Sequence, residues 1–399
     1  MTTNEKLRAN AFDAEKAISA IESVIGDAAR PVALHEPQFA GREWEYVKET
    51  IDTGWVSSAG KFVDEFERRL AEKCEVPFAI ATMNGTAALH VCLMIAGVQA
   101  DDEVITPALT FIATANAISY CGAVPHFCDA DPRTLGIDPD KLDRHLAVTA
   151  EIVQGACRNR KTGRRISALV PMHTFGHPTD MDALAEVARR WHLVLIEDVA
   201  EAIGSRYKGR HPGYHGLVSS LSFNGNKTVT TGGGGAILTS DPEIARRVKH
   251  LTTTAKQPHK WAFLHDMVGY NYRLPNINAA LGCAQLEQLD GFIAAKRKLN
   301  ARYAEAFRDV PGASIFVDAD GSESNFWLVS MVLDTPDEAV RDAFLEASHQ
   351  RGLLCRPVWK GMHHLPMYRH CPRADLTNAE ALESQIINLP SSAILGMAR

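Results

Sequence analysis

Short apolar runs alternate with helical patterns from residue 78 to residue 251, and this alternation limits the possible folds more than any other feature of the chain. The runs predict seven strands, at residues 78–81, 103–106, 124–128, 168–171, 193–197, 219–223 and 236–239. Helical periodicity fills four of the gaps, at residues 86–96, 112–121, 181–190 and 242–251. The alternation predicts an α/β fold with a mostly parallel sheet that helices cover on both faces.

The remaining sequence predicts an appended helix and a second, smaller domain. Apolar residues at helical spacing within residues 4–25 predict a helical extension, residues 1–30. Helices at 43–53, 61–74 and 277–289 belong to a large domain, residues 31–290. A charged helix at 292–307 marks the boundary with a small C-terminal α+β domain, residues 291–399, which has strand patterns at 327–333 and 353–358 and a helix at 338–351.

Composition argues against several classes of partner. The 399 residues are 23% charged, with a formal net charge of -6 and no block of Lys or Arg, so neither nucleic acid nor an anionic membrane is expected as a partner. No apolar stretch reaches the roughly 20 residues that a membrane span requires, and the N-terminus has no signal-peptide pattern. The eight cysteines are scattered without a C-x-x-C pair. We therefore expect a cytoplasmic protein with reduced thiols.

Lys227 is the residue that most indicates chemistry, in the stretch SLSFNGNKTVTTGGGG at residues 220–235. The stretch connects two predicted strands, and its glycines let the backbone approach a bound group closely. A lysine amine forms a Schiff base only if it is held near a carbonyl and kept partly deprotonated. Taken alone, an exposed lysine in a surface hairpin is the more frequent case, because lysine is almost always exposed.

Two further motifs could meet Lys227 at an anionic aromatic cofactor. NGTAALH at residues 84–90 opens a helix with small residues, so its free N–H groups would suit a phosphate, although Gly-Thr at a helix start is more often only a cap. Asp198 lies at the end of a continuous apolar strand, with Glu197 and Glu201 beside it. Its carboxylate would pair with a protonated pyridine nitrogen or cap the next helix.

Three single residues at strand ends have two interpretations each. Phe111 would stack on a ring or belong to the core, and the Ser222 hydroxyl would bind a phosphate or only the backbone. His173 lines the pocket or is a satisfied structural histidine. A fourth group, His363, His364, His370 and Cys371, lacks regular ligand spacing, so we expect surface or substrate-loop histidines there and no metal.

Five stretches together carry a resemblance: NGTAALH, TPALTFIATANAISYCGAVPHFCD, IEDVAEAIGS, SLSFNGNKTVTTGGGG and VGYNYRLPNINAALGCAQLE. They resemble, in order, the DegT/DnrJ/EryC1/StrS family of sugar aminotransferases, which use pyridoxal 5'-phosphate (PLP), and the likeness spans residues 33–392. The resemblance implies the PLP-dependent transferase fold type I, aspartate aminotransferase-like. It also implies a homodimer with active sites at the interface.

The resemblance assigns a role to each matching residue. Lys227 corresponds to the Schiff-base lysine, Asp198 to the partner of the pyridine nitrogen, and Glu201 to a residue near the ring hydroxyl. Phe111 corresponds to the stacking aromatic, and Asn271 to an asparagine that reaches the phosphate from the other subunit. Phosphate contacts are implied for Gly85, Thr86, Ala87 and Ser222. The chain departs from the family pattern TTGEGG at Gly233, which puts in doubt any role for a carboxylate there.

Within the family, TTGGGG, KQPHKWAFLHDMVGYNYRLPNINAA and the N-terminal extension resemble the nucleotide-sugar 4-aminotransferases of legionaminic acid biosynthesis. This implies transfer of an amino group from an amino acid, glutamate as in the family, to C4 of a UDP-linked 2-acetamido-4-keto-6-deoxyhexose. Perosamine-type enzymes, which act on a GDP-linked sugar, look like the next nearest relatives. A PLP sugar dehydratase, which has histidine in place of Lys227, and a non-catalytic regulator are weaker alternatives because the lysine is present.

The long segment at residues 252–275 is rich in aromatics and histidine but has no clear periodicity, which predicts an ordered functional loop. Its cations and aromatics would suit the diphosphate and the base of a nucleotide, or would pack a dimer interface. The residues concerned are Lys256, His259, Lys260, Trp261, Phe263 and Arg273.

Overall fold

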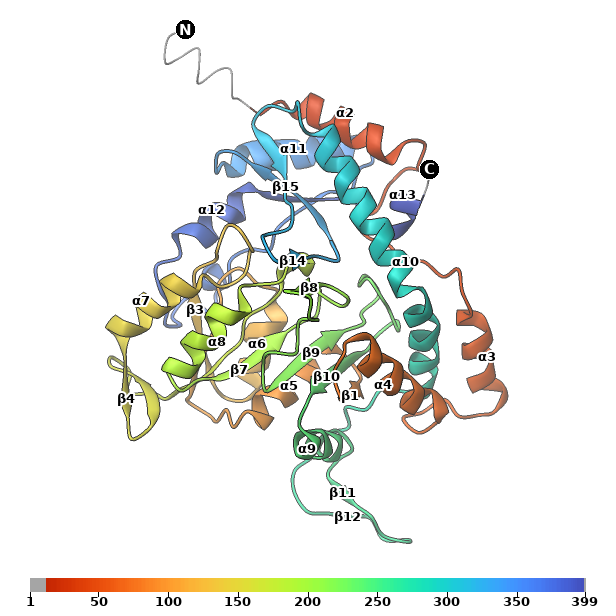
Figure 1. Cartoon of the computed structure of the whole chain (residues 1–399), viewed down its shortest axis with the longest axis vertical. Coiled ribbons are helices and arrows are strands. Elements are labelled where there is room, and N and C mark those ends of the chain that lie inside the picture. The colour runs from red at the N-terminus through yellow and green to blue at the C-terminus, as the bar shows by residue number, and fades with distance from the viewer. Residues whose placement is uncertain (1–11, 398–399) are drawn as a thin grey trace.

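The computed structural model describes residues 12–397, and a seven-stranded sheet forms the centre of its larger part, in the order β1-β10-β9-β7-β6-β2-β3 (Figure 1). Strands β9, β7, β6, β2 and β3 run parallel, and β10 is antiparallel to both of its neighbours. All seven predicted strands are present. Their bounds are β1 Phe78–Thr82, β2 Glu103–Pro107, β3 Val124–Cys128, β6 Ile166–Leu169, β7 Val194–Asp198, β9 Val218–Ser222 and β10 Gly235–Thr239.

Helices cover both faces of the sheet, as the alternation predicts. One face packs against α5 (Gly85–Ile95), α6 (Ile112–Tyr120) and α9 (Pro242–Thr252). The other packs against α4 (Lys61–Lys73), α7 (Pro139–Thr149), α8 (Met181–Arg190) and α10 (Asn276–Ala306). Along β10, Ala236 and Leu238 face the α4 side and Ile237 faces the α5 side, which is the period of two that a strand with two buried faces requires. The α/β fold with a mostly parallel sheet is therefore confirmed.

Two parts of the large sheet's surroundings differ from the prediction. The helices expected at 277–289 and 292–307 are one continuous helix, α10. Gly291 costs about 1 kcal/mol inside a helix, but Leu289 and Phe292 on either side of it are buried, and this packing holds the helix together. No sequence pattern indicated α7 or the hairpin of β4 (Ala150–Val153) and β5 (Ala156–Asn159) that follows it. Helix α7 buries few apolar side chains, so its periodicity is weak.

A four-stranded antiparallel sheet forms the centre of the smaller part, in the order β13-β15-β17-β16. Helix α2 (Ala14–Ile25) shares one buried cluster with this sheet and with the second half of α10. Residues 4–11 of the expected N-terminal helix lie outside the described residues. The boundary expected between residues 290 and 291 falls inside α10, and the division into domains stays a prediction. The bounds are β13 Ala313–Ile315, β15 Val329–Leu333, β16 Arg356–Pro357, β17 Ile386–Leu389, α11 Glu338–Gln350, α12 Thr377–Gln385 and α13 Ala393–Met397.

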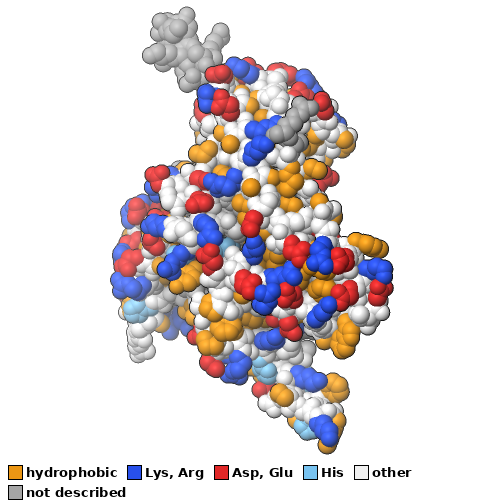
Figure 2. Space-filling view, turned by 45° about the vertical axis from the view of Figure 1, so that its right-hand side comes forward, with side chains coloured by type: hydrophobic (Ala, Val, Ile, Leu, Met, Phe, Trp, Pro, Cys, Tyr) orange, Lys and Arg blue, Asp and Glu red, His pale blue; other side chains and the backbone are white. Residues whose placement is uncertain are grey.

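The segment at 252–275 projects beyond α9 as a short antiparallel ribbon, β11 (Lys256–Gln257) with β12 (Leu264–His265) (Figure 1). Its loop is strongly exposed: Trp261 is 75% and Phe263 is 78% accessible. Figure 2 shows hydrophobic and basic side chains side by side on this projection. Exposed apolar surface of this kind is typical of interaction surfaces.

The remaining elements are short or peripheral. They are α3 (Glu43–Asp52), η1 (Thr174–Gly176), η2 (Met362–His364) and the paired strands β8 (Arg206–Tyr207) and β14 (Ser322–Glu323). Within residues 12–397, no helix has both the length and the apolar character that crossing a membrane requires.

Candidate active site

A cavity of about 300 Å³ opens at the edge of the large sheet where its parallel strands end. Strand β7 ends at Asp198, β9 ends at Ser222, and the chain after β1 and β2 brings Asn84 and Phe111 to the same edge. Ligands bind at this edge in open α/β sheets. The lining also includes residues that the sequence analysis did not single out, namely Thr114, Met172, Asn224, Asn226, Trp327 and Trp359.

One end of the cavity has the features of a phosphate site. Asn84 caps α5, and its Oδ1 accepts a hydrogen bond of 2.8 Å from the Ala87 N–H. The N–H groups of Gly85 and Thr86, at the first two helical positions, have no partner inside the helix. They lie at the positive end of the helix dipole. A Cβ on Gly85 would lie 2.7 Å from the Cβ of Ser222. Glycine is therefore needed for the helix start and the Ser222 hydroxyl to meet at one anion.

Asp198 supplies a carboxylate in the lining that is almost fully buried. Its Oδ2 accepts a hydrogen bond from the Thr114 hydroxyl at 2.9 Å, and its Oδ1 accepts one from the Ala200 N–H at 3.1 Å. Burial raises the pKa of Asp198, because desolvation disfavours the charged form. A cation bound beside it would favour the ionised form again, so this carboxylate suits the protonated nitrogen of a bound ring.

Lys227 enters the cavity from the turn after β9, between an acid and an aromatic ring. Its Nζ lies 3.1 Å from Oε1 of Glu201 and 3.8 Å from the centroid of a Trp327 ring. The second oxygen of Glu201 accepts a hydrogen bond of 2.8 Å from the Phe175 N–H. Burial raises the pKa of Glu201 to about 7, against the attraction of Lys227. The Lys227 amine therefore faces a buried carboxyl whose pKa lies near neutrality, which is the range that suits a general acid or base.

Trp327 is held at Lys227 by hydrogen bonds at both of its ends. The indole Nε1 donates to the Asn226 carbonyl at 2.7 Å, and the Trp327 N–H donates to Oδ1 of Asn325 at 2.8 Å. The Asn325 amide in turn donates to the Glu201 carbonyl at 2.9 Å. Lys296, fully buried in α10, donates from Nζ to the Trp327 carbonyl at 3.0 Å, and burial lowers its pKa. These bonds fix the segment before β15 against the Lys227 turn.

Two aromatic rings form the wall of the cavity next to the start of α6. Phe111 is 48% exposed, and its ring centroid lies 6.0 Å from that of Trp359, which follows β16. Trp359 also packs on the buried Phe175, with 4.9 Å between ring centroids. An exposed aromatic face at this place can stack on a planar ring.

The structure brings seven of the nine predicted site residues together in this lining: Gly85, Thr86, Phe111, Asp198, Glu201, Ser222 and Lys227. Ala87 is buried and its N–H is already bonded to Asn84. Asn271 is exposed and pairs with Thr253 outside the cavity. The roles of all nine residues stay predictions.

His173 does not line the cavity, and the structure supports its interpretation as a satisfied structural histidine. The ring is fully buried; Nδ1 accepts from the Thr179 N–H at 3.2 Å, and Nε2 lies 3.2 Å from Oε2 of Glu197. Glu197 also accepts hydrogen bonds from three backbone N–H groups, at residues 213, 215 and 216. Burial favours the neutral form of Glu197, but its interaction with His173, together with the backbone donors, outweighs burial and lowers the pKa of Glu197. Glu197 therefore anchors a loop on the far side of the strand from Asp198.

Three of the missed residues had a signal in the sequence. Thr114 follows Phe111, the N-cap of α6, by three positions in one of the five resembling stretches, and Asn224 and Asn226 precede Lys227 in another. Trp327 and Trp359 had none, because they come from the smaller part of the chain and reach the cavity only through tertiary packing.

The comparisons with known proteins agree with this geometry. A sequence model of the DegT/DnrJ/EryC1/StrS aminotransferase family matches residues 37–398. The chain belongs to this family. It is 38% identical to the GDP-perosamine synthase of Caulobacter vibrioides over 364 residues, 91% of this chain and 93% of that protein. It is 36% identical to the GDP-perosamine synthase of Escherichia coli O157:H7, over 90% of this chain and 93% of that one.

Solved structures of the family have the same fold. The aminotransferase TlmJ from Streptoalloteichus hindustanus superposes with a TM-score of 0.80 at 29% identity, over 90% of this chain and 93% of that one. A DegT DnrJ EryC1 StrS aminotransferase from Brucella abortus gives a TM-score of 0.78 at 28% identity, over 88% of this chain and 90% of that one. The fold is thus that of the PLP-dependent aminotransferases, fold type I.

This protein is therefore a PLP-dependent sugar aminotransferase. The residues of the cavity fit this cofactor. The α5 start at Gly85 and the Ser222 hydroxyl suit its phosphate, Asp198 suits the ring nitrogen, and Lys227 suits the aldehyde carbon.

Proposed function

We propose that this aminotransferase transfers the amino group of an amino acid, glutamate in our proposal, to C4 of a UDP-linked 2-acetamido-4-keto-6-deoxyhexose. The transfer chemistry rests on one observation: the Lys227 amine is held 3.1 Å from a carboxyl of near-neutral pKa, inside a cavity with a phosphate cradle. The choice of sugar rests on the segment at 252–275 and on the glycine at position 233.

Each site residue has one task in this proposal. PLP, when bound, supplies the electron sink that stabilises negative charge at the donor carbon. Asp198 would keep the ring nitrogen of a bound cofactor protonated, and Phe111 would stack on its ring. Lys227 would be the point of covalent attachment and, as a free amine, would accept and return a proton at the donor carbon. Glu201 orients the lysine amine and takes up or returns its proton.

The 252–275 segment supports a nucleotide-linked substrate. Its loop presents cations against aromatic faces: Lys256 Nζ lies 4.3 Å from the ring centroid of Phe263, and Lys260 Nζ lies 5.3 Å from that of Trp261. Such pairs offer both charge for a diphosphate and an apolar wall for a base. Gly233 has no atom within 4 Å of where a Cβ would stand, so the site lacks a negative charge that the family pattern supplies and has room in its place.

The alternative is a GDP-linked sugar, and the relatives favour it. The C. vibrioides, E. coli and Vibrio cholerae proteins at 34% to 38% identity are GDP-perosamine synthases. Both candidate substrates are 4-keto-6-deoxyhexoses, so they differ at the nucleotide base and at C2 of the sugar.

Steady-state kinetics on matched substrates test the proposal. With the UDP-linked 2-acetamido sugar as reference, replacing the acetamido group by hydroxyl should lower kcat/KM at least about tenfold, because a site built to bond an amide is left with unpaired polar groups. Equal or better turnover of a GDP-linked 4-keto-6-deoxymannose would favour the perosamine-type assignment instead.

We also propose that the enzyme is a homodimer with shared active sites. None of the described residues of the segment 252–275 lines the cavity of its own chain, although Asn271 is assigned to a phosphate contact. The exposed ribbon β11–β12 extends away from its own domain, as a segment that reaches a second copy would (Figure 1). A partner's ribbon would add the missing wall and the missing phosphate contact to each cavity.

A further inference from the structure

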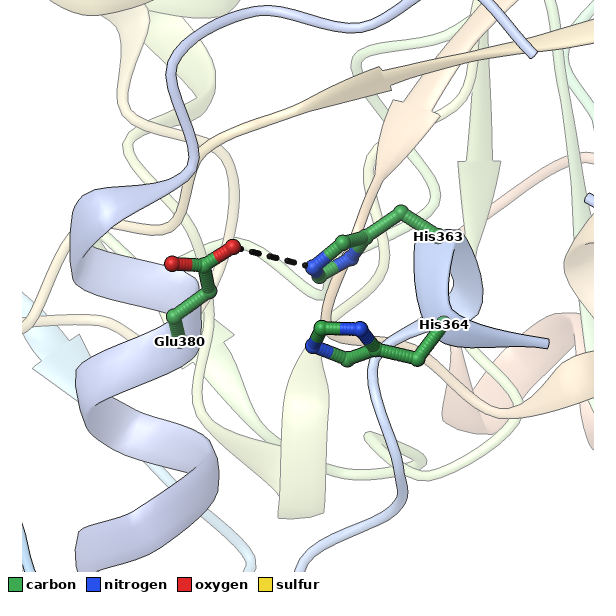
Figure 3. A group of neighbouring side chains, drawn as sticks. All are labelled: His363, His364 and Glu380. Atoms are coloured by element: carbon green, nitrogen blue, oxygen red, sulfur yellow. Dashed lines mark hydrogen bonds and ion pairs between the residues drawn. The ribbon is translucent and has the colours of Figure 1, made fainter. Parts of the chain in front are cut away.

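Two histidines and a glutamate converge outside the active-site cavity, between η2 and α12 (Figure 3). His363 and His364 are neighbours in η2, and both rings point their Nε2 edge toward Glu380 on α12. One ligand atom from each of the three residues lies within 4.8 Å of the other two. Imidazole and carboxylate are ligands that Zn²⁺ and similar dications accept, with three protein ligands and one open position in many sites.

The spacing of the donor atoms suits a tetrahedral metal. His363 Nε2 lies 3.2 Å from Oε1 of Glu380. Two ligands that each stand about 2.0–2.1 Å from a tetrahedral Zn²⁺ are about 3.3 Å apart. His363 Nε2 and Glu380 Oε1 therefore already have the separation of two zinc ligands. The donor atom of His364, which lies within 4.8 Å of both, would have to move closer to them.

The surroundings of the group allow a dication to enter and be held. The His363 side chain is 4% exposed, whereas those of His364 and Glu380 are 41% and 55% exposed, so the group is fixed on one side and open on the other. Oε2 of Glu383 lies 3.7 Å from Nε2 of His364 and adds a second carboxylate at the edge. The formal charges around the group balance, because three cationic side chains and three carboxylates lie there. The cations are Lys360, Arg369 and Arg373, and the carboxylates are Asp375, Glu380 and Glu383.

We propose that His363, His364 and Glu380 form a binding site for a transition-metal dication of the zinc type. The fourth position is open to water or to Glu383. This site departs from our expectation from sequence, which found no regular ligand spacing in 363–371. The third member of the group is Glu380, on α12, and neither His370 nor Cys371 belongs to it. Because Glu380 lies outside the stretch 363–371, ligand spacing within that stretch could not reveal the group.

Metal binding here would act on the wall of the active site. The chain runs from Trp359, in the cavity lining, directly into η2, and the Met362 N–H donates to the Ala108 carbonyl at 2.9 Å, close to the start of α6. A metal that joins η2 to α12 would fix the segment 359–364 at its far end. We expect a bound metal to stabilise the fold by mass action.

Calorimetry with Zn²⁺ on the untagged, PLP-loaded enzyme tests the proposal, with Co²⁺ as a visible probe of the same site. We expect one Zn²⁺ per chain and the visible bands of tetrahedral Co²⁺. His364→Ala and Glu380→Gln should each weaken Zn²⁺ binding by roughly tenfold or more. The matched control is His370→Ala, an exposed histidine of the same segment outside the group, which should bind Zn²⁺ as the wild type does.

The outcomes separate this site from other metal binding. All three variants should retain the PLP absorbance and the circular dichroism of the wild type, because the substituted side chains are exposed. Loss of Zn²⁺ affinity in the two group variants with retention in His370→Ala supports the site. Absence of stoichiometric binding in the wild type, or binding that both group variants retain in full, overturns it, since the metal would then sit at cysteines, at the cofactor or at other histidines.

Discussion

Two carboxylates three positions apart, Asp198 and Glu201, are adapted to different tasks by the groups around them. Both are buried, and burial raises the pKa of each. Asp198 accepts bonds from a hydroxyl and an N–H, and the cation that suits it is the nitrogen of a bound ring. Glu201 has its cation in the chain itself, the Lys227 amine at 3.1 Å. These surroundings suit Asp198 to the nitrogen of a bound ring and place Glu201 beside the lysine.

Lys227 should be the covalent attachment point of PLP. Borohydride reduction of the loaded wild type should place the phosphopyridoxyl group on Lys227 in a mass-spectrometric peptide map. Lys227→Arg keeps a cation beside Glu201 but offers no suitable amine, so the visible band should vanish and activity should fall by about 10³-fold or more. Lys249→Arg, at an exposed lysine of α9, is the control and should change neither. A reduced adduct on any other lysine would refute the assignment.

Glu201 should make the stability of the cofactor-free protein depend on pH. Its pKa is raised from 4.5 to about 7, so the folded state keeps a proton that the unfolded state loses between these values. The extra stability is present at low pH and is lost as pH rises toward 7. Relative to Glu201→Gln, which does not titrate, the wild type should therefore lose up to about 3 kcal/mol of unfolding free energy between about pH 5 and about pH 8.

Denaturant unfolding of the two proteins over this pH range measures the difference. Glu243→Gln, at an exposed glutamate paired with Arg246, is the control, because the pKa of Glu243 is lowered and the group stays ionised throughout. The difference between wild type and Glu243→Gln should be flat. A flat difference for Glu201→Gln as well would show that Glu201 titrates normally in the folded state.

At the scale of elements, the sequence predicted what local patterns determine. The seven strands and the helices between them have clear periods, and the motifs at residues 84–90 and 220–235 lie next to strand ends, where the topology brings them together. What depends on long-range packing was not predictable. The two helices predicted at 277–289 and 292–307 are one helix because Leu289 and Phe292 are buried. Trp327 reaches Lys227 because Asn325, in the same turn, donates to the Glu201 carbonyl and Lys296, on α10, donates to the Trp327 carbonyl.

The contact of the α5 start with the end of β9 gives an element-scale prediction. Gly85→Ala puts a Cβ 2.7 Å from the Cβ of Ser222, which forces the helix start away from the strand and opens the phosphate cradle. The dissociation constant for PLP, measured by fluorescence titration, should rise about tenfold or more, the loss of one or two hydrogen bonds to a charged group. Gly233→Ala is the matched control in the same region, since its Cβ meets nothing within 4 Å. Equal PLP affinity in both variants would show that the close contact of Gly85 with Ser222 does not contribute to PLP binding.

At the scale of the whole molecule, the 252–275 segment contributes no residue to the cavity of its own chain. Large apolar side chains stay exposed on the 252–275 segment, among them Trp261, Phe263 and Val268 at 75%, 78% and 81%. Exposed apolar surface of this kind is unfavourable in water and is typical of interfaces between proteins. A second copy related by a two-fold axis would cover both ribbons and complete both cavities at once, because an isologous contact serves each subunit equally.

Complementation between two inactive variants tests the shared site. Asn271→Ala should weaken the hold on PLP in the cavity of the partner subunit, whereas Lys227→Ala disables the cavity of its own chain. In a hybrid dimer of the two, both lesions fall in the same composite site, and the other site is wild type at both positions. After subunit exchange, an equimolar mixture should therefore regain activity, up to about a quarter of the wild-type value if half of the dimers are hybrids with one working site.

The control mixture, Lys227→Ala with Asp198→Ala, should regain none, because both of these residues belong to the cavity of their own chain and each hybrid site is damaged. Exchange is verified by native mass spectrometry of tagged and untagged subunits. Proven exchange without recovery in the first mixture would mean that Asn271 acts within its own chain or not at all.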